Sequence, residues 1–311
     1  MLVVTGLNGT AERDWPAYCE ELILRGEFPL DLDWVSSWDG ELQRMNSGKA
    51  GAPYRFPHTL IELQAVWAQM LDYRSLEGLT RRLSDMGVLP DFDDFTTIWR
   101  RVRQVSTVVR LPRCGVVEVS SDGTGIKVNC RGEYMDERYR LKRRPKRFIK
   151  VVITSDPRRR KLLAVSASVD GEGSSEPETA QRHIGEVMRR GRRVSKCYAD
   201  GAYDTKGFFN FLQRHGIPSA VKVRRNASTR ARGSRMRGVE AREYLERGYR
   251  RWADEREYGM RWPGTEGIFS AVKRKFGERV RARKREEMCR EAERRFWAYD
   301  VMVSYAKRQS G

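Results

Sequence analysis

Three acidic residues stand at the ends of apolar segments and are the first candidates for chemistry. Asp122 lies in VVEVSSDGTGIKV, Asp200 follows VSKCYA, and Glu266 lies in GMRWPGTEGIFSAVKRKFG. Carboxylate oxygens suit Mg²⁺, whereas Zn²⁺ sites usually include His or Cys, which do not accompany these residues. Two such ions can activate the nucleophile and stabilise the leaving oxygen of a phosphodiester. We expect Asp122 to bridge two Mg²⁺ ions, with Asp200 and Glu266 each completing one site.

The overall charge favours a polyanionic partner. The 311 residues include 61 Lys and Arg against 42 Asp and Glu, a formal net charge of +19. Such a protein binds nucleic acid well because its cations displace the counterions condensed on phosphates. A membrane-surface or ribosome-associated protein would be equally basic, so the charge alone leaves these alternatives open.

Several classes of protein are disfavoured by what the sequence lacks. The five cysteines are widely spaced and form no CxxC pair, which argues against a disulfide framework or a zinc site. The opening MLVVTGLNGT is not a secretory signal, and no segment approaches 18 uninterrupted apolar residues. We therefore expect a cytoplasmic protein that associates with the nucleoid through DNA and not with membranes.

Residues 57–110 are predicted to form a helical DNA-binding region after a peripheral segment, 1–56. Apolar spacing predicts helices over about 60–72, from Ser75 to near Gly87, and after the LPDFDD turn. The third helix has a buried stripe that includes Trp99 and leaves Arg100, Arg101 and Arg103 outside. This arrangement resembles a helix-turn-helix. The alternative is an ordinary solvated basic helix face.

Residues 111–305 are predicted to form an α/β domain with a ribonuclease-H-like mixed sheet flanked by helices. The β-rich segments are 116–121, 126–130, 148–154 and 162–169, followed by a helix to about Arg190, a strand at 194–199, a helix at 205–215 and a strand at 220–223. A final helix carries Glu266. The order places Asp122 on the first strand and Asp200 at the end of the fourth, so all three acids can meet in one site. A single DG dipeptide is often only a turn, but three acids in this order favour a site.

Basic residues around this domain are candidate DNA contacts. Lys273 lies two helical turns beyond Glu266 and hence on a similar face, while Tyr258 and Arg261 precede it closely. Residues 131–150 and 222–238 are rich in Lys and Arg, and a basic insertion spans about 222–260. We expect 222–238 to be a loop that DNA orders. The remaining candidates for phosphate contacts are Lys127, Arg224 and Arg225.

The strings SDGTGIKV, YADGAYD and GTEGIFSAVKRKFG resemble the catalytic regions of DDE transposases of prokaryotic insertion sequences, families Four and Five. LDYRSLEGLTRRL, LPDFDDFTTIWRRV and VKVRRNASTRARGS are similar to other segments of that group. The resemblance implies cleavage and joining of DNA at terminal inverted repeats with Mg²⁺ or Mn²⁺. It makes Asp122, Asp200 and Glu266 the catalytic triad. The Tyr-Arg-Glu-Lys signature falls on Tyr258, Arg261, Glu266 and Lys273, with four residues between Arg261 and Glu266 instead of three.

A transposase must hold two element ends together, so a homodimer acting on repeat and target DNA is expected. Two alternatives stay open. One is a metal-dependent nuclease or resolvase without strand transfer. The other is a non-catalytic DNA-binding protein derived from a transposase.

Overall fold

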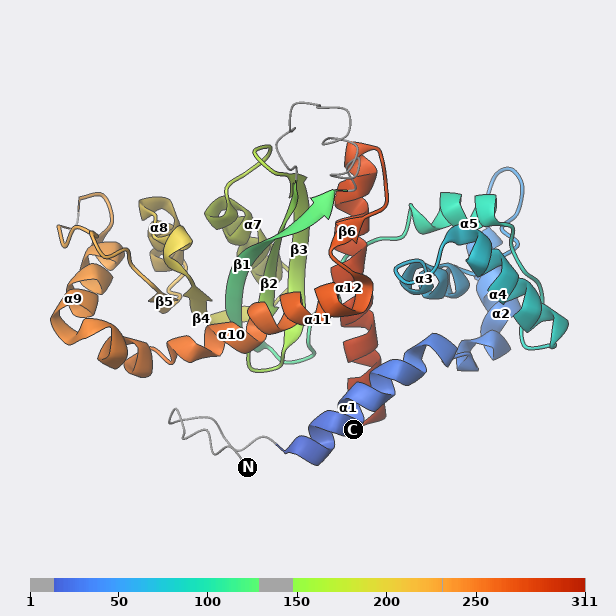
Figure 1. Cartoon of the computed structure of the whole chain (residues 1–311), viewed down its shortest axis with the longest axis horizontal. Helices are drawn as coiled ribbons and strands as arrows, with labels where there is room; N and C mark the ends of the chain where they lie inside the picture. The colour runs from blue at the N-terminus through green and yellow to red at the C-terminus, as the bar shows by residue number, and fades with distance from the viewer. Residues whose placement is uncertain (1–13, 129–147, 231, 311) are drawn as a thin grey trace, which may run out of the picture.

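The computed structural model describes residues 14–128, 148–230 and 232–310. A six-stranded mixed sheet lies in the middle of the molecule. Figure 1 shows helices α2 to α5 at one end, helix α9 at the other, and the long helix α12 between the sheet and the N-terminal helices. The basic segment predicted at 131–150 falls almost wholly outside the described residues.

The sheet has ribonuclease-H-like topology, which confirms the predicted fold class. Its strands follow the order β3-β2-β1-β4-β5, and β6 also pairs with β1. β2 runs antiparallel to both β1 and β3, β4 and β6 run parallel to β1, and β5 runs parallel to β4. The strand bounds are β1 Val116–Val128, β2 Phe148–Asp156, β3 Lys161–Val169, β4 Arg193–Ala199, β5 Ser219–Val221 and β6 Arg279–Val280.

The first strand is longer than the sequence suggested. Segments 116–121 and 126–130 were expected to be separate, but β1 runs through both as far as Val128. The polar DGTG segment looked like a turn. It is extended instead because Gly123 and Gly125 pair in register with Val152 and Lys150 of β2. Asp122 therefore lies within a strand, held by neighbours before and after it.

Helices α7 (Glu176–Arg189) and α8 (Lys206–Arg214) cover one face of the sheet, as predicted. α7 begins with a capping box between Ser175 and Glu178. Its apolar side chains pack with Val117 and Val119 of β1 and with β4 and α8 in one continuous buried cluster. This cluster covers the face of β1 that lies opposite to the side chain of Asp122.

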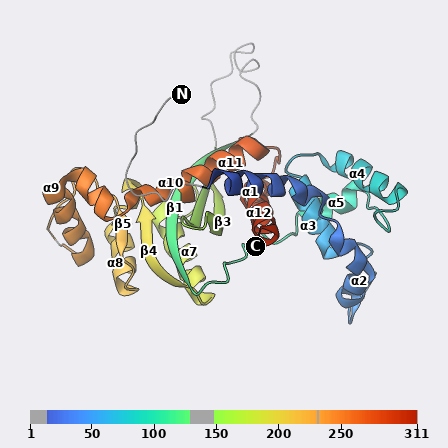
Figure 2. The ribbon, with the colours of Figure 1, turned by 90° about the horizontal axis from the view of Figure 1, so that it is seen from below.

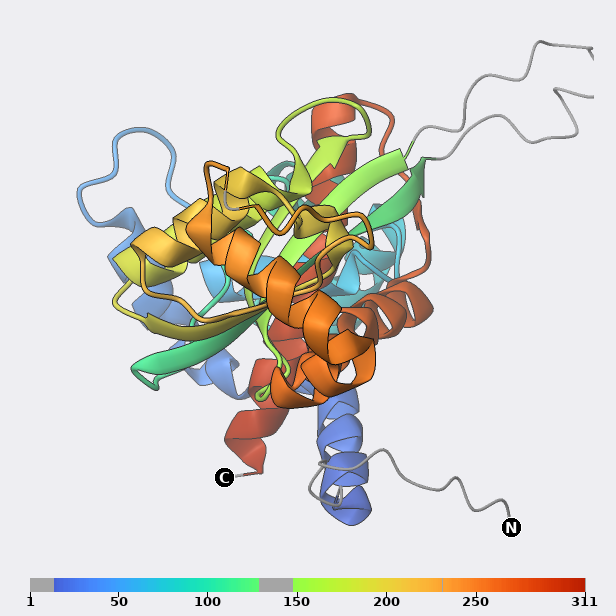
Figure 3. The ribbon, with the colours of Figure 1, turned by 90° about the vertical axis from the view of Figure 1, so that its left-hand side faces the viewer.

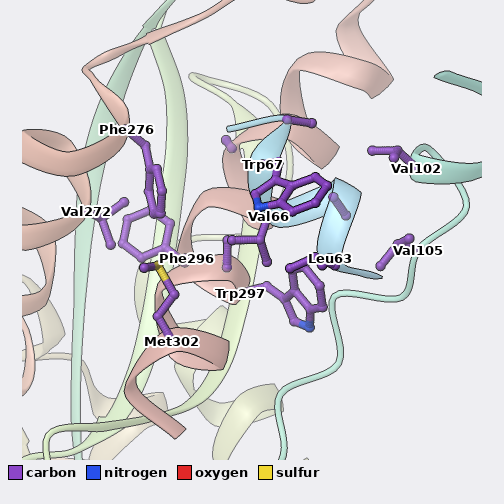
Figure 4. Packing of buried hydrophobic residues seen from close by; sticks show 14 of the residues in the cluster. Leu63, Val66, Trp67, Val102, Val105, Val272, Phe276, Phe296, Trp297 and Met302 are labelled. Carbon is purple, nitrogen blue, oxygen red and sulfur yellow. The ribbon is translucent and has the colours of Figure 1, made fainter. Parts of the chain in front are cut away.

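Helices α11 (Glu266–Phe276) and α12 (Arg285–Gln309) cover the other face. Figure 4 shows Phe296, Trp297 and Met302 of α12 lying between α11 and the N-terminal helix α3. Helix α12 was not predicted, because charged residues such as Glu291 and Arg295 are buried among its apolar ones and obscure the helical period. The helix joins the N-terminal region to the sheet.

The three predicted N-terminal helices are present as α3 (His58–Trp67), α4 (Tyr73–Asp85) and α5 (Phe95–Val102). Segment 1–56 is more regular than expected, since it contains α1 (Trp15–Glu27) and α2 (Trp38–Asn46). Figure 2 shows α1 passing across α12, and there Arg25 Nη1 donates to Tyr299 OH at 3.2 Å. Trp99 was expected in the buried stripe of α5 but is 43% exposed.

The basic insertion contains a helix that the sequence did not reveal. The predicted loop over 222–238 ends early, because α9 (Arg235–Glu255) begins at Arg235 and bends at Gly248, where φ is 75°. Figure 3 shows α9 in front of the edge of the sheet formed by β4 and β5. None of the described helices combines the length and apolarity that crossing a bilayer requires.

Candidate active site

One edge of β1 is left open around Asp122. On that edge β4 pairs with β1 as far as Ser120, and β6 pairs with it again from Lys127. The opposite edge is paired with β2 throughout residues 120–127. The open edge therefore runs from Ser121 to Ile126 and is bounded by the end of β4 and the start of β6.

Asp122 and Asp200 lie level with each other beside this opening. Ser120 is paired with Tyr198 in the parallel β1–β4 ladder, and each aspartate lies two residues beyond its member of that pair. Neighbouring strands are about 4.8 Å apart, so the continuation of the two strands brings these carboxylates together. Asp200 leaves β4 and caps the short helix Gly201–Tyr203 by accepting from Ala202 N at 2.8 Å.

Glu266 approaches from the first turn of α11. Its charge and that of Asp200 both raise the pKa of Asp122, which places all three carboxylates within electrostatic reach. The acidic side chain at the helix N-terminus is favoured by the helix dipole. The joint action of the three carboxylates in one catalytic site stays a prediction.

Asp122 is only 8% exposed and has a partner for each oxygen. Gly123 N donates to Oδ1 at 2.8 Å, and Arg261 Nη1 donates to Oδ2 at 2.7 Å. Burial is the main cause that raises the pKa of Asp122 to about 6, while the Gly123 N–H and Arg261 oppose the rise. Arg261 therefore reaches the triad despite its altered spacing from Glu266.

The segment before Glu266 is hydrogen-bonded to two strands, β1 and β2. It consists of η4 (Tyr258–Met260) and α10 (Arg261–Gly264). Ser120 Oγ donates to the carbonyl of Arg261 at 3.4 Å, and Ser155 Oγ donates to that of Gly264. A Cβ at Gly264 would lie 2.9 Å from Pro157 Cβ, so only glycine permits this close approach. These contacts fix where Arg261 and Glu266 enter the site.

A fourth carboxylate, Glu176, was missed by the sequence analysis. It is the first residue of α7, and a Cβ at Gly123 would lie 2.6 Å from its Oε1. Burial and the charge of Asp200 raise the pKa of Glu176, while Lys150 opposes that rise. The available signal was an acidic residue at the start of the helix that follows the three antiparallel strands. It resembled an ordinary helix-start acid.

A buried hydrogen-bonded chain supports β1 next to Asp122. Ser121 and Thr154 share a hydrogen bond of 2.8 Å, and His183 of α7 contacts Thr154 at 3.1 Å and Ser166 at 2.7 Å. Burial is the main cause that lowers the pKa of His183 to about 4. His183 is therefore a neutral link between α7 and β2 and β3.

The donor chemistry of the site fits divalent cations that prefer oxygen. Asp122, Asp200, Glu266 and Glu176 supply carboxylate oxygens without nitrogen or sulfur, which suits Mg²⁺ or Mn²⁺ better than Zn²⁺. The raised pKa values of Asp122 and Glu176 reflect crowded, partly buried negative charge. Within the described ranges, no three acidic, His or Cys side chains are already gathered as an ion-binding group.

The predicted DNA contacts of the catalytic domain differ in their surroundings. Lys127 pairs with Glu278 at 3.0 Å, and Lys273 is half-buried on α11. Arg224 Nε donates to the Gly201 carbonyl at 3.3 Å, just after Asp200, and Arg225 is exposed. Tyr258 is largely buried against Trp252, with ring centroids 5.2 Å apart.

The three arginines of the third N-terminal helix do not share one free face. Arg100 is exposed, and Arg101 lies over the ring of Tyr54 at 4.7 Å. Arg103 was expected outside but is partly buried, with Nη2 2.8 Å from Glu287 of α12. It therefore faces the catalytic domain.

Comparisons with known proteins show the family of this chain. A family model described as "Transposase DDE domain" matches residues 117–301, and a second model with the same description matches residues 23–131. The first match covers more than half of the chain and includes all three acids of the triad. The chain belongs to the DDE transposase family.

Solved structures give weaker similarities. The Mos1 strand transfer complex is 11% identical over 85% of this chain and 84% of that chain, with a TM-score of 0.24. The piggyBac transposase synaptic complex with hairpin DNA is 11% identical over 93% and 81%, with a TM-score of 0.27. These values are too low to place any residue of the site.

Proposed function

We propose that this transposase binds the terminal inverted repeats of a DNA element, cleaves the element ends and joins them to target DNA. The observation that carries the proposal is the placement of Asp122 within β1 and of Asp200 directly after the neighbouring strand β4, beside an open sheet edge. Glu266 enters the same region, and its charge acts on Asp122. Two element ends must be held together, so the active form in this proposal is a homodimer.

We assign the metal ligands to Asp122, Asp200 and Glu266. Two Mg²⁺ or Mn²⁺ ions bound there would supply activation of the attacking hydroxyl and stabilisation of the leaving oxygen. Arg261 favours the ionised form of Asp122 and orients Oδ2, while Gly123 N–H orients Oδ1. Ser120 and Ser155 hold the segment that carries Arg261 and Glu266.

Replacement of Asp122 by Asn tests this assignment. Asn keeps the size of the side chain but loses the charge that attracts a cation. We expect Mg²⁺-dependent cleavage of inverted-repeat DNA to fall on the order of a thousandfold, since metal-ion stabilisation is worth several kcal/mol. Binding of the repeat without metal should change little, and full cleavage by Asp122→Asn would refute the mechanism.

A target plasmid in the same reaction separates transposition from simple nuclease activity. The proposal expects products in which the cleaved element end is joined to the plasmid. Cleavage without any joined product would leave a metal-dependent nuclease or resolvase as the function.

A further inference from the structure

A cavity of about 430 Å³ lies between the N-terminal helices and the β6–α12 segment, away from the triad. Trp99 and Arg103 of α5 contribute to one wall, and Arg283, Lys284 and Arg294 contribute to the other. The volume is in the usual range for sites that bind small ligands or chemical groups. The cavity thus joins the predicted DNA-binding region to the catalytic domain.

The cavity has an excess of positive charge, because the carboxylates in its wall are already engaged. Glu291 accepts from the backbone N–H groups of Arg281 and Ala282 at 2.9 and 2.8 Å. Glu287 accepts from Arg103 at 2.8 Å. Asp72, the remaining carboxylate of the lining, caps α4. These hydrogen bonds restrict the carboxylates, whereas Arg283, Lys284 and Arg294 remain available to an anion.

Arg294 is the most unusual residue of the cavity. It is 4% exposed, and its Nε has no hydrogen-bond partner. Among the described residues, no hydrogen bond or ion pair engages its guanidinium. Burial is the main cause that lowers the pKa of Arg294, while the charges of Glu287 and Glu291 oppose that change without a direct ion pair. Burying a guanidinium without hydrogen bonds costs several kcal/mol. Such a group destabilises the fold and is typical of a site that binds an anion.

Trp99 adds an aromatic surface at the same place. It is 43% exposed although it lies at the cavity wall, and Arg103 lies over its ring at 4.5 Å. Arginine next to an exposed aromatic ring is a combination that nucleic-acid sites use, the arginine for phosphate and the ring for the neighbouring sugar or base.

We propose that this cavity binds a backbone phosphate of the element-end DNA, with Arg294 as the buried anchor and Arg283 and Lys284 at the entrance. The inference rests on the proposed function, because it takes the ligand from the DNA that the transposase binds. A phosphate held here touches both α5 and α12, so it sets the position of the DNA relative to both regions at once. It is separate from the phosphate at which the triad acts.

Arg294→Met gives a sharp test because Met fills a similar space without charge. We expect this variant to have a higher melting temperature than the wild type, since the unpaired charge is gone. Its binding to a duplex made from the DNA flanking the reading frame should weaken about tenfold, with a salt slope smaller by about 0.9, as for one lost phosphate contact. Lower stability with unchanged affinity and slope would show that Arg294 is only structural.

Arg283→Gln is the second variant, because an exposed entrance residue can change without affecting the fold. Arg189→Gln on α7 removes an equally exposed charge far from the cavity and is the matched control. Each phosphate of the duplex is then replaced in turn by a neutral methylphosphonate. At one position, the methylphosphonate should weaken DNA binding by the wild type and by Arg189→Gln. The same methylphosphonate should have little further effect on DNA binding by Arg283→Gln or Arg294→Met.

Inorganic phosphate tests the cavity without DNA. At matched ionic strength, phosphate should raise the melting temperature of the wild type more than that of Arg294→Met. An equal rise in both proteins would overturn the anion site. Protection by phosphate without any coupled methylphosphonate position would overturn the DNA assignment. If the wild type fails to bind the duplex at every salt concentration, both the proposed function and the DNA assignment fail. The phosphate experiment still decides whether the cavity binds an anion.

Discussion

Arg261 and Asp122 are 139 residues apart in the chain, and their side chains form an ion pair with a nitrogen–oxygen distance of 2.7 Å. Both side chains are largely buried. Arg261 therefore neutralises part of the negative charge of the clustered carboxylates. A divalent cation at the triad would meet the same requirement, so Arg261 and the metal act on the same charge.

Arg261→Gln should make the protein more dependent on metal. At pH 8, where Asp122 is ionised, loss of one partner of a buried pair is expected to cost about 3 kcal/mol of unfolding free energy without metal. Mg²⁺ binds the native state and should restore more stability to this variant than to the wild type. Thermal unfolding with and without Mg²⁺ measures the difference. The double variant Asp122→Asn/Arg261→Gln is the control, and an equal Mg²⁺ effect in wild type and Arg261→Gln would contradict the expectation.

Glu176→Gln should weaken metal binding while leaving DNA binding intact. The carboxylate lies against Gly123 and within electrostatic reach of Asp200, so it contributes negative charge to the site. The Mg²⁺ concentration for half-maximal cleavage should rise about tenfold, as for other residues that support metal ligands. Glu186→Gln on the same helix should have no such effect. An unchanged Mg²⁺ requirement in Glu176→Gln would show that this acid only contributes to the first turn of α7.

His183 should make the fold less stable in mild acid. Its pKa is about 4 in the native state, below its ordinary value of 6.5, so the unfolded chain takes up the proton more readily. Stability is then lost as the pH falls from about 6.5 to about 4, by about 3 kcal/mol in total. Denaturant unfolding between pH 7 and pH 4 should show a shallower decline for His183→Asn. The variant His215→Gln, at an exposed position, is the control, and an equally steep decline in His183→Asn would exclude His183 as its source.

Asp300 should be the most sensitive polar residue of α12. It accepts from Lys161 Nζ at 2.5 Å and from Leu162 N at 3.2 Å, in a buried position. Asp300→Ala leaves the lysine buried and unpaired, and we expect a loss of about 3 to 5 kcal/mol in denaturant unfolding. The exposed pair of Glu172 with Arg285 is the control, since Arg285→Ala should cost less than about 1 kcal/mol. Similar losses in both variants would contradict this difference.

The parts of the fold that follow a clear apolar period were predictable from the sequence. The helices α3, α7 and α8 and the strands β2 to β4 lie where the pattern placed them. The pattern failed at Asp122, where two glycines resembled a turn but pair with β2. It failed again in α12, where ion pairs bury residues such as Asp300 and Arg295 that sequence patterns treat as exposed.

The candidate site was predictable to the extent that its residues end recognisable elements. Asp200, just after β4, and Glu266, at the start of α11, met that condition, whereas Asp122 lies within β1. The ion pair of Arg261 and the approach of Glu176 to Gly123 depend on how α10 and α7 dock on the sheet. No local pattern contains that information, because the partners are distant in the chain.

The position of α12 has a consequence for the timing of folding. Its Phe296 and Trp297 lie in the core that joins α3, α11 and the sheet, so these elements leave apolar surface open until this helix is in place. During synthesis the chain emerges N-terminus first. The triad is therefore complete in sequence once Glu266 has been made, but its support is complete only after α12 has left the ribosome.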